Sequence, residues 1–335
     1  MTRDAPAWLI VRLAVRWIRL ASPLLSLLLW AVVFACYWAR PDRGAAVTII
    51  PPLLWALPGL GSALLGRGRA RLLTVVLWVV FLFCFGELFS LARGLRGPGP
   101  GFEAARREGR AVRVITINAA GDAEALERVI PYAPDIVVLQ EPPLPEEVEE
   151  VSRRLFGQQA AVSRGWDCDI LYRGRPPAAG TRLTTAQARV ALRPGDEIAV
   201  VGTHLASTRP SFHLWLRDRW HRLAQDRRRR REEMREVASV VESVPSGTPT
   251  VLAGDFNAPA GDAVFRLLRP RLRDAFSEAG RGWGNTWSAD LPLVRIDQVW
   301  ISAQWRAVSV TARSAEPSDH RMVVCDLERV PSQPL

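Results

Sequence analysis

The first 93 residues contain three long apolar stretches, and no other feature of the chain restricts its fold as strongly. Each is close to the roughly 20 apolar residues that a helix needs to cross a bilayer, and Glu87 is the only charged residue within them. A cleaved signal peptide would explain the first stretch but neither of the others. Pro51, Pro52 and Pro58 make the middle stretch the weakest, because proline breaks helices. The sequence therefore predicts a membrane region over residues 1–93 with about three transmembrane helices, at about 20–39, 45–65 and 72–92.

The Arg residues beside these stretches bear on orientation. Counted over all three stretches they divide evenly between the two sides, but the first stretch is preceded by four and followed by Arg40 and Arg43 alone. Cytoplasmic flanks are enriched in Lys and Arg, and the first helix usually dominates, so we expect the N-terminus inside. Three crossings would make this a multi-pass protein of the cell membrane with its C-terminal part outside the cytoplasm, whereas two crossings would reverse the side.

The net charge of +10 is unevenly distributed along the chain. All 44 basic residues are Arg, against 34 acidic residues, and residues 1–109 carry +8 of the total, which leaves +2 for residues 110–335. Net charge bears on partners rather than on fold, and most of the excess here flanks apolar stretches. The charge therefore does not identify a nucleic-acid-binding protein. Residues 94–110, rich in Gly, Pro and charge, are expected to form a linker.

Residues 111–330 have the pattern of one mixed α/β domain. Apolar runs at 112–117 and 135–140 predict buried strands, and the segments 122–130 and 145–156 predict helices. Short strands and one long helix over 211–244 follow, with the last strands near 250–253, 295–301, 307–312 and 322–327. Strand–helix alternation followed by strand pairs is typical of an α/β sandwich.

Six short patterns place an acid, an amide or an imidazole at the end of a predicted strand. They are ITIN with Asn118, VVLQE with Glu141, VVGTH with His204, GDFN with Asp255 and Asn257, RIDQVW with Asp297, and PSDH with Asp319 and His320. Each alone is more often a turn former, a helix cap or a solvated loop residue. Ligands of α/β sheets bind where strand ends meet at one edge, so together the six patterns predict one cleft.

These residue types suit phosphoester hydrolysis assisted by a divalent metal. Mg²⁺ prefers oxygen ligands, often one or two carboxylates with water and phosphate, for which Glu141 and Asp319 are candidates, with Mn²⁺ as a possible alternative. No HExxH or CxxC pattern supports a zinc site. Asp297 and His320 could form an acid–base pair. Asn118, Asn257 and His204 could donate hydrogen bonds to charge developing on a phosphoryl group.

The order ITIN, LQE, GTH, GDFN, RID, SDH resembles the endonuclease/exonuclease/phosphatase superfamily, which includes DNase I, apurinic endonucleases, inositol-phosphate phosphatases and neutral sphingomyelinases. The resemblance covers residues 110–330. It implies a four-layer sandwich of two mixed β-sheets flanked by helices. It also implies that Glu141 is the main metal ligand, assisted by Asp319, that Asp255 orients or deprotonates the attacking water, and that His320, held by Asp297, contacts the scissile phosphate or transfers a proton. Asn118 and Asn257 would position phosphate and metal-bound water, with His204 as a second imidazole.

The sequence departs from this pattern in two places. Apurinic endonucleases carry an Asp two residues after the first Asn, where this chain has Ala120; the nearby Asp122 is expected to cap the next helix instead. The stretch WDCDILYRG lacks a clean match to the Tyr or Arg that some members place over the phosphate, with Tyr172 and Arg173 as possible replacements.

Three functions remain open from the sequence. The first is a membrane-anchored, nuclease-like phosphodiesterase, the second a phospholipid or sphingomyelinase-like phosphodiesterase, and the third a non-catalytic binding module with a degenerate site, suggested by Ala120. The segment Arg209–Arg235 has ten Arg and a net charge of +6; it could bind nucleic acid or anionic headgroups or form a solvated helix with internal ion pairs. The expected partners are a phosphodiester substrate, from nucleic acid or a phospholipid headgroup, and the bilayer. No obligate protein partner is evident.

Overall fold

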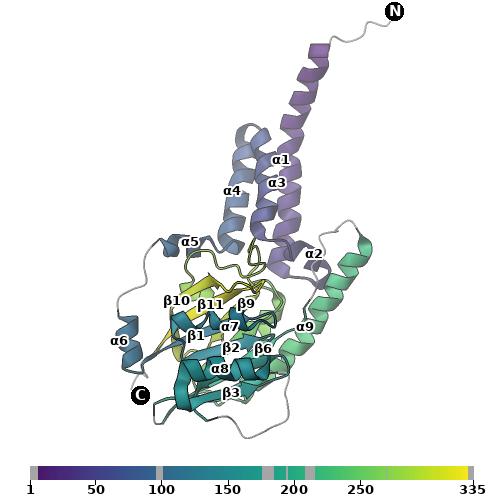
Figure 1. Cartoon of the computed structure of the whole chain (residues 1–335). Helices are drawn as coiled ribbons and strands as arrows, with labels where there is room; N and C mark the ends of the chain where they lie inside the picture. Colours follow the sequence, from purple (N-terminus) through teal and green to yellow (C-terminus); the bar gives the residue numbers. More distant parts are fainter. Residues whose placement is uncertain are drawn as a thin grey trace, which may run out of the picture. The chain divides into compact units, whose positions relative to one another are not determined.

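The computed structural model describes residues 7–95, 101–175, 185–193, 195–207, 216–269 and 271–330 (Figure 1). The chain forms two compact units. One contains residues 1–88 together with 210–225, and the other contains residues 89–209 and 226–335. The long helix α9 (Arg217–Ser243) has residues in both units.

The first unit consists of apolar helices. These are α1 (Ala7–Ala39), α2 (Ala45–Thr48), α3 (Pro52–Leu65) and α4 (Gly68–Phe85), with a 3-10 turn at Asp42–Gly44. Two segments, Val11–Ala39 and Gly68–Phe85, are long and apolar enough to cross a membrane, with mean hydropathies of 2.0 and 1.9. The segments Asp42–Thr48 and Pro52–Leu65 would make a third crossing only as one bent span, with an angle of 73° between them. The bend falls at the Pro51–Pro52 pair. Two or three helices are thus consistent with membrane association.

A short chain of hydrogen bonds connects α1, α3 and α4 inside this unit. Trp78 of α4 is fully buried and donates from Nε1 to Ser26 Oγ of α1 (3.0 Å), and Ser26 Oγ donates to the carbonyl of Gly59 in α3 (2.7 Å). A Cβ atom at Gly59 would lie 2.1 Å from the Trp78 ring, so glycine permits this close packing. Large apolar side chains such as Leu24 and Leu28 are exposed instead, as expected of helices whose outer surface is not in water.

A six-stranded sheet forms one half of the second unit. Its strand order is β10-β11-β1-β2-β4-β3, and only β1 and β2 are parallel neighbours. The bounds are β1 Ala111–Asn118, β2 Ile136–Gln140, β3 Ala160–Arg164, β4 Cys168–Arg173, β10 Trp305–Ser314 and β11 Arg321–Arg329.

A five-stranded sheet forms the other half, with the order β5-β6-β7-β9-β8. Here β6 and β7 are the parallel pair. The bounds are β5 Ala186–Arg193, β6 Asp196–His204, β7 Thr250–Asp255, β8 Arg273–Asp274 and β9 Asp297–Ile301.

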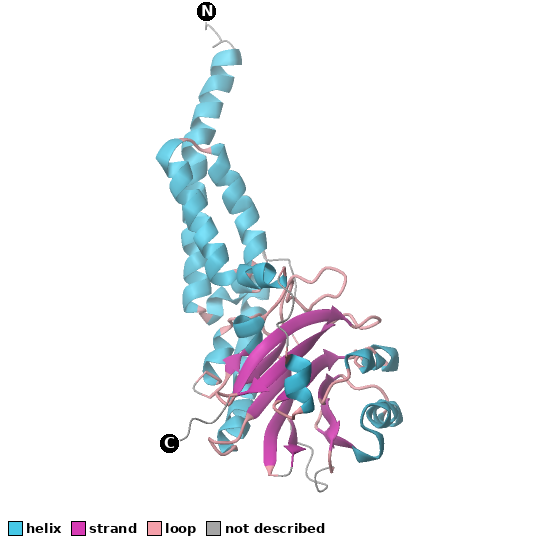
Figure 2. Cartoon of the chain, turned by 90° about the vertical axis from the view of Figure 1, so that its left-hand side faces the viewer, coloured by secondary structure: helices cyan, strands magenta, loops and turns pink. Residues whose placement is uncertain are grey.

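The two sheets face each other with helices on their outer sides (Figure 2). Along β1, Val114 belongs to the core between the sheets, whereas the next residue, Ile115, packs against α7 (Ala123–Glu127) and α8 (Pro145–Phe156). Along β7, Ala253 faces the core between the sheets and Leu252 packs against α9 and the 3-10 helix Ala263–Leu267. Successive strand residues therefore serve two apolar layers, which confirms the predicted four-layer sandwich.

Two short helices lie in and just before the segment expected to be a linker. Ser90 of α5 (Leu88–Gly94) exchanges hydrogen bonds with Gly282, through its hydroxyl (2.9 Å) and its carbonyl (2.8 Å). In α6 (Phe102–Arg107), Arg106 forms a bidentate ion pair with Asp135 (2.8 and 2.9 Å). Residues 96–100 lie outside the described part of the chain. A further short helix, α10 (Ala275–Ala279), follows β8.

Candidate active site

The two parallel strand pairs bring the predicted polar residues to one place. Asn118 ends β1 and Gln140, its partner in register, ends β2 directly before Glu141. In the other sheet His204 ends β6 opposite Asp255, the last residue of β7, and Asp255 in turn faces Asp297 at the start of β9. Hydrogen bonds between the two sheets join these strand ends into one cluster.

Asn118 connects the two sheets. Its side-chain nitrogen donates to Glu141 Oε1 (2.9 Å) and to Asp255 Oδ2 (3.2 Å), while its oxygen accepts from the backbone N–H of Ala120 (3.0 Å). These partners fix which end of the amide faces the carboxylates. Asn118 is buried, whereas the Glu141 side chain is 43 % exposed and can therefore meet a ligand.

Three loop residues of the site have left-handed backbone conformations that non-glycine residues rarely adopt. They are Ala120, Glu141 and Asn257, with φ of 50°, 46° and 46°. Such conformations cost of order 1–3 kcal/mol each and cluster at functional sites. At Ala120 the conformation aims a backbone N–H at Asn118, so this residue contributes to the site through its backbone.

Gly254 is required by the close approach of β6 and β7. Its φ is 156°, and a Cβ atom there would lie 1.9 Å from the Thr203 carbonyl oxygen. The next residue, Asp255, is buried and accepts from the backbone N–H of Asn257 (2.8 Å). The Asn257 amide donates to the Leu205 carbonyl (2.9 Å) and lies 3.3 Å from His204 Nε2. The GDFN segment is thus held by the end of β6.

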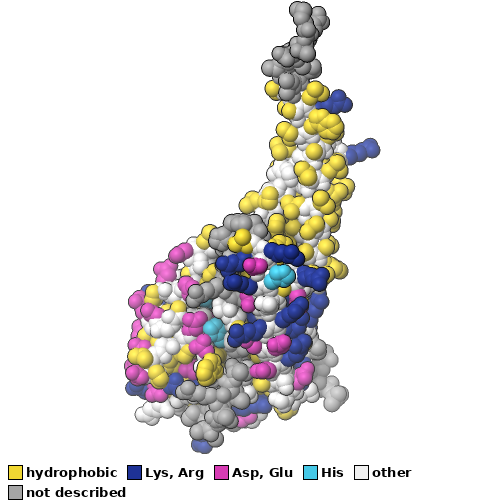
Figure 3. Space-filling view, turned by 90° about the vertical axis from the view of Figure 1, so that its right-hand side faces the viewer, with side chains coloured by type: hydrophobic (Ala, Val, Ile, Leu, Met, Phe, Trp, Pro, Cys, Tyr) yellow, Lys and Arg dark blue, Asp and Glu magenta, His cyan; other side chains and the backbone are white. Residues whose placement is uncertain are grey.

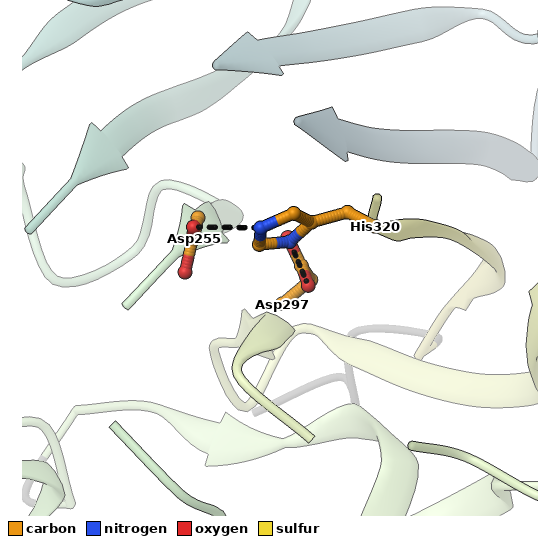
Figure 4. Close-up of side chains that lie close together, drawn as sticks. All are labelled: Asp255, Asp297 and His320. Carbon is orange, nitrogen blue, oxygen red and sulfur yellow. Dashed lines mark hydrogen bonds and ion pairs between the residues drawn. The ribbon is translucent and has the colours of Figure 1, made fainter. Parts of the chain in front are cut away.

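His320 lies between two buried carboxylates (Figure 4). Its Nδ1 is 3.0 Å from Asp297 Oδ2, and its Nε2 is 3.9 Å from Asp255 Oδ2. Burial opposes the charged ring, but the negative charge of Asp297 and the hydrogen bond to it, followed by the charge of Asp255, outweigh burial and raise the pKa of His320 to about 10. Burial, with the charge of Asp297, raises the pKa of Asp255 to about 6, against the opposing effect of His320.

The second imidazole has a partner that the sequence analysis did not single out. His204 Nδ1 lies 2.8 Å from Asp167 Oδ2, and Nε2 faces Asp255 (3.7 Å) and Glu141 (3.8 Å). Burial works against the charged ring, but these carboxylates, beginning with the Asp167 hydrogen bond, raise the pKa of His204. Asp167 lies in the turn between β3 and β4, and its carbonyl accepts from the backbone N–H of Glu141 (3.3 Å), which ties this turn to the end of β2.

Ser318 attaches the SDH segment to the rest of the site. Its hydroxyl donates to the Asn118 carbonyl (2.7 Å) and accepts from the His320 backbone N–H (3.0 Å). Asp319 is 64 % exposed, with Oδ2 3.4 Å from Trp287 Nε1 and Oδ1 4.0 Å from His320 Nε2. All eight predicted residues therefore lie in one group, with the exposed Asp319 at its edge and Ser318 as a connecting residue that sequence reasoning missed.

Two groups of donors could in principle hold a cation. Ligand atoms of Asp255, Asp297 and His320 lie within 4.8 Å of one another, and all three residues are buried. Mg²⁺ usually keeps several waters, and His320 already uses Nδ1 on Asp297. The half-exposed carboxylate of Glu141 suits a hydrated hard cation better than the buried triad.

Two other sequence expectations are resolved by the structure. Asp122 caps α7, as expected, by accepting from the backbone N–H groups of Glu124 (2.8 Å) and Ala125 (3.1 Å).

The prediction that Tyr172 and Arg173 could contact the phosphate is wrong, because they lie at the end of β4 that is far from the site. That strand runs antiparallel to β2 with Cys168 opposite Gln140 and Tyr172 opposite Ile136, so these two residues lie at the edge away from the site.

Comparisons with known proteins identify the family of the chain and agree with its fold. The family model described as Endonuclease/Exonuclease/phosphatase family matches residues 115–320. Among solved structures, humanised D. rerio TDP2 with 14 mutations shares 18 % sequence identity, over 65 % of this chain and 99 % of that chain, with a TM-score of 0.50. An endonuclease/exonuclease/phosphatase from Bacteroides vulgatus shares 16 %, over 66 % and 99 %, also with a TM-score of 0.50. No curated protein matches the chain.

Proposed function

The chain belongs to the endonuclease/exonuclease/phosphatase family, and we propose that it is a membrane-anchored, divalent-metal-dependent phosphodiesterase with a nuclease-like site. Members of this family are hydrolases that act on phosphoester bonds. The observation that carries the proposal is a cluster across two sheets, joined by hydrogen bonds and one ion pair; its members are Asn118, Glu141, Asp255, Asp297 and His320. Such a cluster has the donors, acceptors and acid–base groups that phosphoryl transfer needs.

Family members typically use divalent metals, and we propose Mg²⁺, or Mn²⁺ in its place, held by Glu141 and assisted by Asp319. Oxygen ligands with room for water are the environment that Mg²⁺ prefers. Glu141 fits because one of its oxygens is fixed by Asn118 (2.9 Å) while the side chain stays half-exposed. When bound, the metal would neutralise charge on the phosphoryl oxygens.

The chain's own residues would then perform the acid–base work. Asp255, with its carboxylate anchored by the Asn257 backbone N–H (2.8 Å), would orient a water and accept its proton. His320 is protonated at neutral pH, because Asp297 raises its pKa to about 10, and would donate a hydrogen bond to a phosphate oxygen. Asp297 would act as a positioning residue for the ring. His204 and Asn118 would add hydrogen bonds to the developing charge.

The anchoring part of the proposal depends on the apolar helices. Two segments, Val11–Ala39 and Gly68–Phe85, have the length and hydropathy of membrane spans. Residues 1–93 would thus hold the catalytic domain, residues 111–330, at a membrane surface, with residues 94–110 between them. The substrate would be a phosphodiester of nucleic acid or of a phospholipid headgroup, on the extracytoplasmic side if the helices cross three times.

Hydrolysis of bis(p-nitrophenyl) phosphate by the full chain in detergent, with Mg²⁺ or Mn²⁺, tests the catalytic part. We expect activity that chelation with EDTA abolishes and that returned metal restores. Glu141→Ala and His320→Ala should each lower kcat/KM by at least about a hundredfold. Glu146→Ala is the matched control, because Glu146 is an exposed glutamate in the first turn of α8, and should keep wild-type activity.

Full activity in both site variants would contradict the proposed roles. The absence of hydrolysis in the wild type with either metal would instead favour a binding module. The melting temperature of each variant should be recorded alongside, so that loss of the fold is not mistaken for loss of a functional group.

A further inference from the structure

The polarity of helix α5 (Leu88–Gly94) is the reverse of that of an ordinary surface helix. Its two polar side chains, Ser90 and Arg93, are three residues apart and therefore share one face. This face packs on residues of the proposed catalytic domain, and Ser90 is buried there. The opposite face holds Leu91 and Ala92, which are both exposed. Helices on the surface of a water-soluble domain usually bury their apolar face instead.

Hydrogen bonds attach the polar face of α5 to the segment that includes and follows α10. Ser90 and Gly282 exchange two of them (2.9 and 2.8 Å). The Arg93 guanidinium donates to the Ser277 carbonyl (3.3 Å). A Cβ atom at Gly94 would lie 2.6 Å from the backbone nitrogen of Gly282, so glycine permits this close packing. Helix α5 is therefore a built part of this unit's surface.

Few large apolar side chains are exposed on the described part of the second unit. There are seven, and three of them lie within seven residues, at Phe89 (61 %), Leu91 (39 %) and Leu95 (90 %). On the face drawn in Figure 3, charged side chains are spread over the second unit, whereas hydrophobic side chains cover the helices of the first unit. Apolar side chains that gather in one place on a charged surface mark an interaction site.

The chain itself brings α5 close to any bilayer that α4 crosses. Helix α4 (Gly68–Phe85) has the hydropathy of a membrane span, and only Gly86 and Glu87 separate its last residue from α5. Three peptide steps reach at most about 11 Å. Helix α5 would therefore begin in or beside the headgroup layer. Helices that lie in this layer turn their apolar face into the boundary between headgroups and acyl chains, whatever their length.

A second protein chain fits this face less well than a bilayer does. A stable protein interface buries about 800 Å² on each partner, whereas even an aromatic side chain buries only about 150–250 Å². One Phe and two Leu residues therefore supply too little apolar area. The adjoining cavity of about 430 Å³ is lined by Phe89, Ala92, Arg93 and Ser277. Apolar walls with one guanidinium match a lipid, in which acyl chains lie below a phosphate.

We propose that α5 is an interfacial helix that binds the surface of the bilayer crossed by α4. The binding face consists of Phe89, Leu91, Ala92 and Leu95. This inference rests on the membrane anchoring in the proposed function, and it adds a second attachment, made by the unit that contains the active-site cluster. Anchoring by the spans alone would leave that unit on a tether.

The second attachment is connected to the site through a short stretch of chain. Gly282, which is bound to α5, lies five residues before Trp287, and Trp287 Nε1 is 3.4 Å from Asp319 Oδ2. A bilayer that holds α5 would therefore restrict how the active-site cluster is oriented relative to the membrane surface.

Spin labels on single cysteines test the proposal in nanodiscs that hold one full chain each, where a second copy is excluded. Leu91→Cys and Leu95→Cys place the label on the proposed face. Val76→Cys places it in the middle of α4. Leu144→Cys is the matched control, because Leu144 is an exposed leucine (60 %) at the start of α8.

The native cysteines need one change before labelling. Cys36 and Cys84 are replaced by alanine in every variant, whereas Cys168 and Cys325 are buried and can stay. Collisions of each label with oxygen, which concentrates in lipid, and with a water-soluble nickel chelate then identify its surroundings.

We expect the labels at Leu91 and Leu95 to favour oxygen over nickel at least severalfold more than the label at Leu144 does. If the Val76 label lies in lipid but the α5 labels meet nickel as freely as the Leu144 label, the inference is overturned and the anchoring proposal stands. Shielding of the α5 labels from both reagents would also overturn it, in favour of a contact within the chain. A Val76 label in water would overturn the anchoring proposal, and the inference with it.

A double variant tests whether the apolar side chains cause the binding. Phe89→Gln with Leu95→Gln removes two of them and keeps the polar contacts of Ser90 and Arg93. The label at Leu91 should then meet nickel at least severalfold more often, whereas Leu144→Gln should leave it unchanged. Melting temperatures close to that of the parent chain would show that both variants are folded. An unchanged Leu91 label in the folded double variant would contradict the proposal.

Discussion

The imidazole of His320 lies within reach of three carboxylates, and their combined charge decides its protonation. Asp297 contacts Nδ1 at 3.0 Å, and Asp255 and Asp319 face Nε2 at 3.9 and 4.0 Å. Burial of the ring works in the opposite direction but is overcome, so the pKa of His320 rises to about 10. In the metal-free protein His320 is therefore a cation across the physiological range, suited to bind a phosphate oxygen rather than to act as a base.

Asp297→Asn should lower the pKa of His320 markedly, because it removes the nearest charge and the charge-assisted hydrogen bond. The ring signals of the four histidines can be followed by NMR against pH in metal-free protein, with His320 assigned from His320→Gln.

The unfolding free energy should depend on pH through the same His320 imidazole. Since the folded pKa of about 10 exceeds the ordinary value of 6.5, the stabilisation is complete below pH 6.5 and is lost as pH rises through 10. This slope should flatten in Asp297→Asn, and an unchanged titration would refute the assignment of the pair.

The residues for which we propose a direct chemical role were easier to identify in the sequence than the residues that hold them in place. Glu141 and Asp255 follow or end apolar strands, and His320 directly precedes one, which are patterns visible in the sequence. Asp167 lies in the turn before β4, and only the three-dimensional pairing of β2 with β4 brings it beside His204. Ser318 is likewise a common loop residue until its bond to the Asn118 carbonyl is known. Long-range contacts of this kind leave no local pattern.

Among the secondary-structure elements, the parallel pair β6–β7 aligns two of the proposed catalytic groups. Its register puts His204 opposite Asp255, and the approach of Gly254 to the Thr203 carbonyl sets the separation. The strands themselves were predictable because their residues alternate between two apolar layers. The two-residue strand β8 and the short helix α10 were not, since segments of two to five residues carry too little periodicity.

Gly254→Ala should displace Asp255 and lower both stability and activity. The added Cβ would lie 1.9 Å from a backbone oxygen at a φ of 156°, so the strands must separate. We expect a loss of about 1 to 3 kcal/mol in unfolding free energy and about a hundredfold in kcat/KM, because small misplacements of catalytic groups cost that much. Gly247→Ala is the matched control, since a Cβ there meets nothing within 4 Å. Equal activity in both variants would show that this close approach does not position Asp255.

For the whole molecule, the charge distribution and the apolar helices have one shared explanation. Residues 1–109 carry +8 of the net +10, and most of the Arg residues in this range flank the apolar helices. A bilayer would account for both facts, because Arg residues flank spans at the interface. The number of spans would then determine the side of the membrane on which the proposed active site lies. With Val11–Ala39 and Gly68–Phe85 alone there are two, and with the bent pair there are three.

Reporter fusions at both termini separate the number of spans from their orientation. Alkaline phosphatase is active only outside the cytoplasm. Green fluorescent protein fluoresces only inside the cytoplasm, because it does not become fluorescent when it is exported unfolded. Three spans place the termini on opposite sides, and two place them on the same side, whatever the orientation. Because the first helix has more Arg before it than after it, we expect an intracellular N-terminus and an active C-terminal phosphatase fusion. Fluorescence at both termini would mean two spans, and the catalytic domain would then face cytoplasmic substrates.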